Sequence, residues 1–247
     1  MKENIIKIGE IIYNKEGDKA IIVKKSEKPK YHTIQFCDEF HSEHDYSNTN
    51  LKRGVFRNKN KKTVFGKGYI GFGRPSKVDG KHIKSYRVWY SMLERCYSGK
   101  YDTYDKVEVC DEWLSYQNFA DWFDSSNYKD GYELDKDLKQ YGTENKIYSP
   151  NTCIFLPQRI NTFIRSMRRT NITGEIGISY HNSHKKWRAQ TNDFDTGKNI
   201  VKYATNKEEA LLIYKELRKI QIEKAKQYMR NLNEFNEDII SLIDNYN

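Results

Sequence analysis

The fold of this chain is decided by residues 132–157, YELDKDLKQYGTENKIYSPNTCIFLP. The stretch opens with a strand-like piece that contains three consecutive charges, Asp135, Lys136 and Asp137. A polar loop follows, and the apolar residues at the end of the stretch lead directly into a further amphipathic segment. We therefore expect a strand, a loop and a second apolar segment that runs into a short helix carrying Asn161.

Three stretches around this centre have apolar residues at helical spacing. Ser85–Cys96 and Tyr116–Phe123 come before it and carry large aromatic side chains on one side. Glu208–Met229 comes after it and has alternating charge on its outer face. We expect three amphipathic helices whose apolar stripes belong to the protein core.

The N-terminal part has a different pattern. Residues 1–50 contain short β-type runs separated by turn-forming residues, which predicts a small β-domain, either an SH3-like barrel or a curled sheet. Residues 51–84 are basic and rich in glycine, so we expect a connector that is either a plain linker or a segment lying along nucleic acid. Together with the helices, these elements indicate an α+β protein.

Composition argues against disorder and against a membrane protein. The chain has 247 residues and a mass of 29.4 kDa, which suits one large domain or two to three small ones. Aromatic residues make up 14% of it and supply bulky surface for a core. No window approaches the ~18 consecutive apolar residues of a membrane span, and the N-terminus lacks the apolar segment of a signal peptide. We therefore expect no membrane partner and a cytoplasmic location.

The net charge of +9 is unevenly distributed. Residues 51–100 carry 14 basic and 2 acidic side chains, residues 101–150 carry 5 and 12, and residues 151–200 carry 8 and 3. The basic excess therefore flanks an acidic block. This alternation suits a protein that holds phosphates on either side of a cation-binding site.

The four cysteines are Cys37, Cys96, Cys110 and Cys153, and they include no Cys-x-x-Cys pair. Reduced, buried thiols are therefore expected. Three of the cysteines lie in the central region without a neighbouring histidine to complete a zinc site, so we favour packing over structural zinc.

Several short motifs keep fixed spacings across the central region. They are Trp89, Met92, Arg95-Cys96, Val109-Cys110-Asp111-Glu112-Trp113, Phe119, Trp122, Leu134-Asp135-Lys136-Asp137, Tyr148-Ser149-Pro150-Asn151-Thr152-Cys153 and Asn161. With these motifs, residues 85–165 resemble the HNH endonucleases encoded by bacteriophages and mobile introns. The resemblance implies that residues 85–170 form a ββα-metal module, a two-stranded ribbon and a helix around one divalent cation, Mg²⁺ or Mn²⁺.

The resemblance also implies roles for individual residues. In such modules an Asp of the first strand and an Asn or His of the helix bind the cation, and the corresponding residues here are Asp135 and Asn161, which are 26 positions apart. Asn151 or Asn145 would brace the loop between them.

One position departs from the family pattern. The general-base histidine that should follow the metal-binding Asp is Lys136 in this chain. A lysine is protonated near neutral pH and cannot accept a proton. We therefore expect Lys136 to act electrostatically on a phosphate or leaving group, and Asp137 to be a second metal ligand or the base.

A second set of motifs occupies residues 174–228. It consists of Gly177-Ile178-Ser179-Tyr180-His181, Lys186-Trp187-Arg188-Ala189-Gln190 and Glu208-Glu209-Ala210. With these motifs the segment resembles AP2-type DNA-binding domains. The resemblance implies that residues 171–247 place a three-stranded antiparallel sheet in the major groove, with a helix behind it.

The side chains expected to contact double-stranded DNA follow from strand alternation and from the charge pattern. Alternation puts Lys186, Arg188 and Gln190 on one strand face. Arginine can pair with guanine and glutamine with adenine, so this face suits base recognition. Acidic Asp193 and Asp195 lie close by and work against it. Further contacts are expected from Tyr180, Lys185, Arg165, Arg168 and Arg169.

The two resemblances predict a metal-dependent DNA endonuclease of the phage HNH type, acting in the cytoplasm of a bacterial host cell at a site chosen by its C-terminal domain. The missing histidine leaves two alternatives open. One is a catalytically inactive DNA-binding protein, and the other is a phage protein that inhibits a host defence system by binding a host protein. The sequence also leaves the oligomeric state open.

Overall fold

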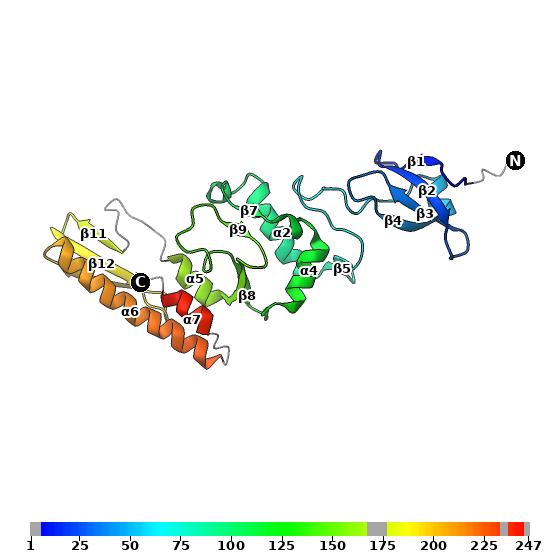
Figure 1. Ribbon diagram of the computed structural model, residues 1–247. Helices are drawn as coiled ribbons and strands as arrows, with labels where there is room; N and C mark the ends of the chain where they lie inside the picture. The colour runs from blue at the N-terminus through cyan, green and yellow to red at the C-terminus, as the bar shows by residue number, and fades with distance from the viewer. Residues whose placement is uncertain (1–5, 167–176, 233–236, 245–247) are drawn as a thin grey trace. The chain divides into compact units, whose positions relative to one another are not determined.

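The computed structural model describes residues 6–166, 177–232 and 237–244 (Figure 1). It shows an α+β protein with several small sheets and, among the described residues, no closed barrel. The chain groups into two compact units, residues 1–98 with 114–119 and residues 99–113 with 120–247.

The elements up to residue 97 are β1 (Ile11–Tyr13), β2 (Lys19–Lys25), β3 (Tyr31–Phe36), β4 (Glu43–Ser47), α1 (Asn48–Lys52), β5 (Lys77–Val78), β6 (Lys81–His82) and α2 (Lys84–Tyr97). Those up to residue 166 are η1 (Asp102–Tyr104), β7 (Glu108–Val109), α3 (Asp111–Leu114), α4 (Tyr116–Ser125), β8 (Tyr132–Asp135), β9 (Ile147–Tyr148), β10 (Ile154–Pro157) and α5 (Gln158–Ser166). The remaining ones are β11 (Ile178–His181), β12 (Lys186–Asn192), β13 (Asn199–Ala204), α6 (Lys207–Asn231) and α7 (Glu237–Asp244).

The N-terminal strands form an open antiparallel sheet in the order β1-β2-β3-β4, so of the two expected forms, a barrel and a sheet, the sheet is present. β1 has only three residues, and β4 runs directly into α1, which Ser47 caps by accepting a hydrogen bond from the backbone N–H of Asn50. Leu51 and Phe56 then pack on the buried side chains of the sheet. The core is therefore covered by the segment that follows the sheet.

The side chain of Gln117 on α4 makes three hydrogen bonds to the backbone of the glycine-rich segment. Gln117 donates hydrogen bonds to the carbonyl oxygens of Ile70 (2.8 Å) and Arg74 (3.2 Å), and its own oxygen accepts one from the Arg74 N–H (2.9 Å). A Cβ atom on Gly71 or Gly73 would lie within 2.8 Å of this side chain, and both residues have positive φ. These glycines therefore permit a close packing of backbone on helix.

The predicted helices α2, α4 and α6 are all present. Trp89, Met92 and Leu93 on α2 are fully buried, as their periodicity indicated. The ring of Tyr116, at the beginning of α4, lies 5.5 Å from that of Trp89. The aromatic stripes are therefore core, as expected.

Residues 132–157 contain an antiparallel ribbon of β8 and β10, which is followed without a break by α5. Phe155 on one face of the ribbon packs against Trp122 and Phe123 of α4, with ring centroids 5.4 and 5.3 Å apart. Leu156 on the other face joins a buried cluster with Ile160 and other side chains of α5. The ribbon thus has an aromatic face towards α4 and a second face towards α5.

The C-terminal strands form a separate antiparallel sheet with β12 in the centre, and α6 runs along it (Figure 1). Between them lies a small core of Ile178, Ala189, Ala204 and Ala210. Further along α6, Ile222 and neighbouring apolar residues join the cluster that contains α5. The sheet, its helix and the ribbon therefore belong to one compact unit.

Candidate active site

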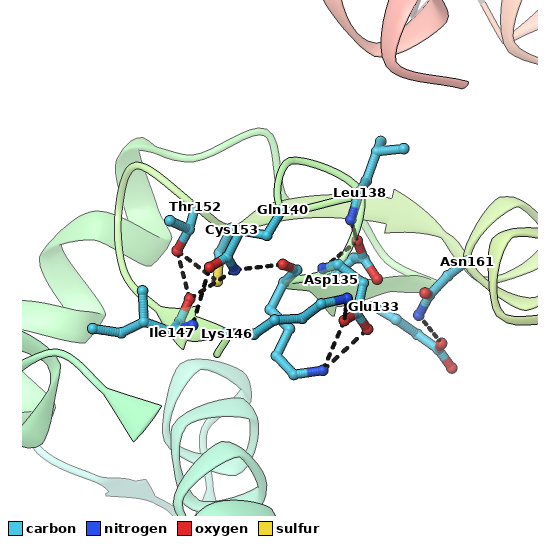
Figure 2. Close-up of polar contacts among 11 residues, drawn as sticks. Glu133, Asp135, Leu138, Gln140, Lys146, Ile147, Thr152, Cys153 and Asn161 are labelled. Atoms are coloured by element: carbon cyan, nitrogen blue, oxygen red, sulfur yellow. Dashed lines mark hydrogen bonds and ion pairs between the residues drawn. The ribbon is translucent and has the colours of Figure 1, made fainter. Parts of the chain in front are cut away.

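The ribbon places two carboxylates on the face that α5 covers. Alternate residues of a strand point to the same side, so Glu133 and Asp135 of β8 share one face. Their partners across the ribbon are Leu156 and Ile154, which belong to or pack against the apolar cluster with α5. Asn161 of α5 donates a hydrogen bond from Nδ2 to Glu133 Oε2 at 2.7 Å (Figure 2).

Asn161 has a second polar atom that finds no such partner. Its Oδ1 is buried and, among the described residues, accepts no hydrogen bond. Buried acceptors are nearly always paired in folded proteins, so this oxygen marks a place where a donor or a cation fits.

Asp135 is only 3% exposed, and its Oδ1 accepts two backbone N–H groups, from Asp137 (2.9 Å) and Leu138 (2.6 Å) (Figure 2). The carboxylate therefore fixes the turn by which the chain leaves β8. Within the described residues no group of three or more His, Cys, Asp and Glu side chains is placed to hold a metal ion. The structure places Glu133 beside Asn161 and puts Asp135 on the same strand face, so the candidate ligands are these two carboxylates and the amide oxygen of Asn161.

Lys136 is in contact with protein groups. Its side chain is 8% exposed, and Nζ lies 3.0 Å from both carboxylate oxygens of Asp137. It also lies over the rings of Tyr104 and Tyr148, at 4.8 and 5.7 Å from their centroids. This burial disfavours the phosphate contact that the sequence suggested for Lys136.

Asp137 is held between two ammonium groups. Besides Lys136, Lys146 donates to its Oδ1 at 2.7 Å. With both oxygens engaged by cations, Asp137 stabilises the loop electrostatically, and this arrangement disfavours the role of base or second metal ligand.

The loop between β8 and β9 is braced by Gln140. Its amide donates to the carbonyl oxygens of Lys136 (2.6 Å) and Ile147 (2.9 Å) and accepts from the Ile147 N–H (3.0 Å). Thr152 adds a hydrogen bond from its hydroxyl to the same Ile147 carbonyl (2.7 Å). Asn151, expected to brace this loop, is exposed and is not one of these groups.

Sequence reasoning missed Glu133, Gln140 and Lys146. For Glu133 a signal existed, because it stands two positions before Asp135 on a strand and so shares its face. Gln140 and Lys146 lie in a polar loop whose path no periodicity describes.

The cysteines are less uniformly buried than expected. Cys153 is buried, Cys96 and Cys110 are half-buried, and Cys37 is exposed. Cys37 follows the end of β3, where the chain turns out of the sheet. Burial raises the pKa of Cys153 to about 12 and also raises that of Cys110, which disfavours the thiolate form that zinc binds.

The C-terminal sheet presents one face away from α6. Lys186, Arg188 and Gln190 are on this face, and the Nε of Arg188 donates to Ser179 Oγ across the strands at 3.3 Å. Tyr180 is not among them, because it pairs in register with Trp187 and so lies on the side of α6. Lys185 is exposed in the turn. Arg165 falls within α5, and Arg168 and Arg169 lie outside the described residues.

The acidic turn after β12 is neutralised by neighbouring helices. Lys224 of α6 lies 2.6 Å from Asp193 and 3.1 Å from Asp195. Its hydrogen bond, with those from Thr196, lowers the pKa of Asp193 to about 2. Arg159 of α5 pairs with Asp195 at 2.8 Å. These carboxylates therefore connect the turn to α5 and α6.

Among the described residues, the helices lack the combination of length and apolar character that crossing a membrane requires. Comparison of the chain with models of known protein families, with curated proteins and with solved structures gave no match.

Proposed function

We propose that this protein is a DNA endonuclease of the phage HNH type that depends on a divalent cation, Mg²⁺ or Mn²⁺. The observation that carries the proposal is the buried Oδ1 of Asn161, which has no hydrogen-bond partner in the described residues. The Nδ2 of the same side-chain amide donates a hydrogen bond to Glu133. An acceptor left in this state costs about 1–3 kcal/mol. A cation bound by this oxygen and by the carboxylates of Glu133 and Asp135 removes that cost.

The donor set fits such an ion. Carboxylate and carbonyl oxygens are the ligands that Mg²⁺ and Mn²⁺ prefer. When bound, the cation supplies Lewis-acid activation for phosphodiester hydrolysis. The protein contributes a rigid frame, since two backbone amides orient Asp135 and a hydrogen bond orients Asn161 against Glu133.

The C-terminal sheet supports the DNA-binding half of the proposal. Arg188 and Gln190 point away from α6, and the Arg188 guanidinium donates a hydrogen bond to Ser179. The nearby acidic turn is neutralised by Lys224 and Arg159. The cationic, amide-bearing face is therefore suited to the major groove.

A second candidate function is DNA binding without cleavage. The observation that favours it is the mutual pairing of Lys136 and Asp137, which engages the two groups nearest the position of the family's general base. The third candidate function is binding of a host protein, and it predicts no affinity for DNA.

Incubation of supercoiled plasmid with Mg²⁺ or Mn²⁺ tests the nuclease. We expect nicked or linear product, its loss in chelator, and its loss on Asn161→Ala, whereas Thr162→Ala, an exposed neighbour on α5, should cut normally. If the wild-type protein cuts with neither ion, the nuclease proposal fails. Retained plasmid binding would then support the second candidate, and a specific host protein captured without plasmid binding the third.

Base recognition has its own test. Arg188→Ala should reduce discrimination between preferred and random duplexes by about 1–3 kcal/mol. Lys198→Ala, a change of an exposed lysine in the turn before β13, should leave discrimination unchanged. Equal loss of affinity for both duplexes in Arg188→Ala would mean that this strand contacts only the DNA backbone.

A further inference from the structure

The hairpin turn between β11 and β12 brings three electron-pair donors together. Nδ1 of His181 and Nδ1 of His184 are 2.9 Å apart. Ser183 Oγ lies 3.0 Å from the first nitrogen and 3.2 Å from the second. The three atoms therefore form a nearly equilateral triangle.

Backbone and ring contacts hold this arrangement. His181 pairs with Lys186 at the base of the hairpin, and Lys185 adopts a φ of 49°, which closes the turn. The ring of Tyr203 stacks on His184 at 5.0 Å and meets His181 edge-to-face at 5.8 Å. Both imidazoles are thus supported from the neighbouring strand β13.

We propose that His181, Ser183 and His184 form a binding site for a divalent transition-metal ion of the kind that imidazole prefers, such as Ni²⁺, Cu²⁺ or Zn²⁺. Ligands on one face of an octahedron lie about 3.0 Å apart when the metal–nitrogen distance is ~2.1 Å. The distances among the two Nδ1 atoms and the Ser183 Oγ, 2.9, 3.0 and 3.2 Å, match the spacing of ligands on such a face. Solvent completes the remaining positions.

The chemistry of the site separates it from the candidate active site. Two nitrogen donors and a hydroxyl, without a carboxylate, favour borderline transition metals over Mg²⁺. Lys185 and Lys186 are adjacent in sequence and add positive charge, so the affinity is moderate. Ligation through both Nδ1 atoms requires that each ring carry its proton on Nε2.

Calorimetric titration of the tag-free full chain with Ni²⁺, without DNA, tests the proposal. We expect one Ni²⁺ equivalent that is lost, or weakened by at least about tenfold, in His184→Gln and in His181→Gln, since even removing a group that only orients a ligand costs about 10–100-fold in metal affinity. His41→Gln, a change of an exposed histidine on the loop before β4, is the control and should bind as the wild type does.

Ring-nitrogen NMR of ¹⁵N-histidine-labelled protein gives a second readout. On addition of diamagnetic Zn²⁺, the Nδ1 signals of His181 and His184 should shift together at one equivalent. Nickel binding that is unchanged in both hairpin variants, or equally weakened in His41→Gln, would overturn the proposal. The result is independent of DNA cleavage, because neither histidine belongs to the ribbon.

Discussion

Asp135 should have two separable roles, and two substitutions distinguish them. In Asp135→Asn the amide keeps an oxygen where Oδ1 accepts the N–H groups of Asp137 and Leu138. In Asp135→Ala both buried donors lose their acceptor. Each unsatisfied donor costs about 1–3 kcal/mol, so the alanine variant should lose about 2–6 kcal/mol of unfolding free energy relative to the asparagine variant.

Urea denaturation followed by circular dichroism measures this difference, and Mn²⁺ titration measures the other role. Both variants lack the negative charge, so both should lose cation affinity, whereas only the alanine variant should lose much stability. Equal midpoints for the two variants would refute the claim that Asp135 fixes the turn after β8. Cleavage lost only in the alanine variant would show that the turn, not the charge, is required for activity.

Three further predictions concern the C-terminal part. Gly177→Ala should lower the unfolding free energy by more than about 2 kcal/mol, because its φ is +76° and the new Cβ would collide with the Tyr214 ring. Gly197→Ala, with a φ of +70° and open space around it, should lose only about 1–2 kcal/mol through backbone strain. Similar melting temperatures for the two variants would contradict this difference. The pKa of Asp193 is lowered to about 2, so its contribution to the unfolding free energy is complete above pH ~4 and disappears as the pH falls towards 2. Unfolding measured as a function of acid pH should show this loss of stability in the wild type and not in Asp193→Asn. Arg218 is 3% exposed, burial lowers its pKa to about 10, and its Nε and Nη2 have no hydrogen-bond partner in the described residues. Its guanidinium lies over the ring of Phe163, 4.3 Å from the centroid. Arg218→Met should raise the unfolding free energy by about 1 kcal/mol, because relieving two unpaired donors outweighs losing this cation–π contact. A lower melting temperature of the variant would show that the guanidinium is stabilising.

Local pattern predicted the elements well and the polar contacts poorly. Helical spacing of Trp89, Met92 and Leu93 was sufficient to place α2 and its buried face, because apolar residues recur at this spacing when one side of a helix packs in the core. The strand alternation that puts Arg188 opposite Trp187 could also be read directly. Tyr180, expected as a DNA contact, stands two positions after the buried Ile178 on β11 and therefore shares its face on the side of α6.

The environment of the candidate site depends on contacts between distant segments. Lys146 meets Asp137 nine positions away, and Lys224 reaches Asp193 across 31 positions, so neither pairing is visible as a local motif. The sequence places Asp193 close to Arg188 as an unfavourable charge, and only the fold shows that a lysine neutralises it. The same holds for Asn161, whose partner Glu133 is 28 positions earlier.

The proposed function requires that Glu133, Asp135 and Asn161 bind one divalent cation. Anomalous diffraction from crystals of the full chain soaked in Mn²⁺ tests it most directly. We expect a manganese peak within bonding distance, about 2.2 Å, of both carboxylates and of Asn161 Oδ1. Crystals that hold Mn²⁺ elsewhere, with no peak between β8 and α5 at saturating concentration, would contradict it.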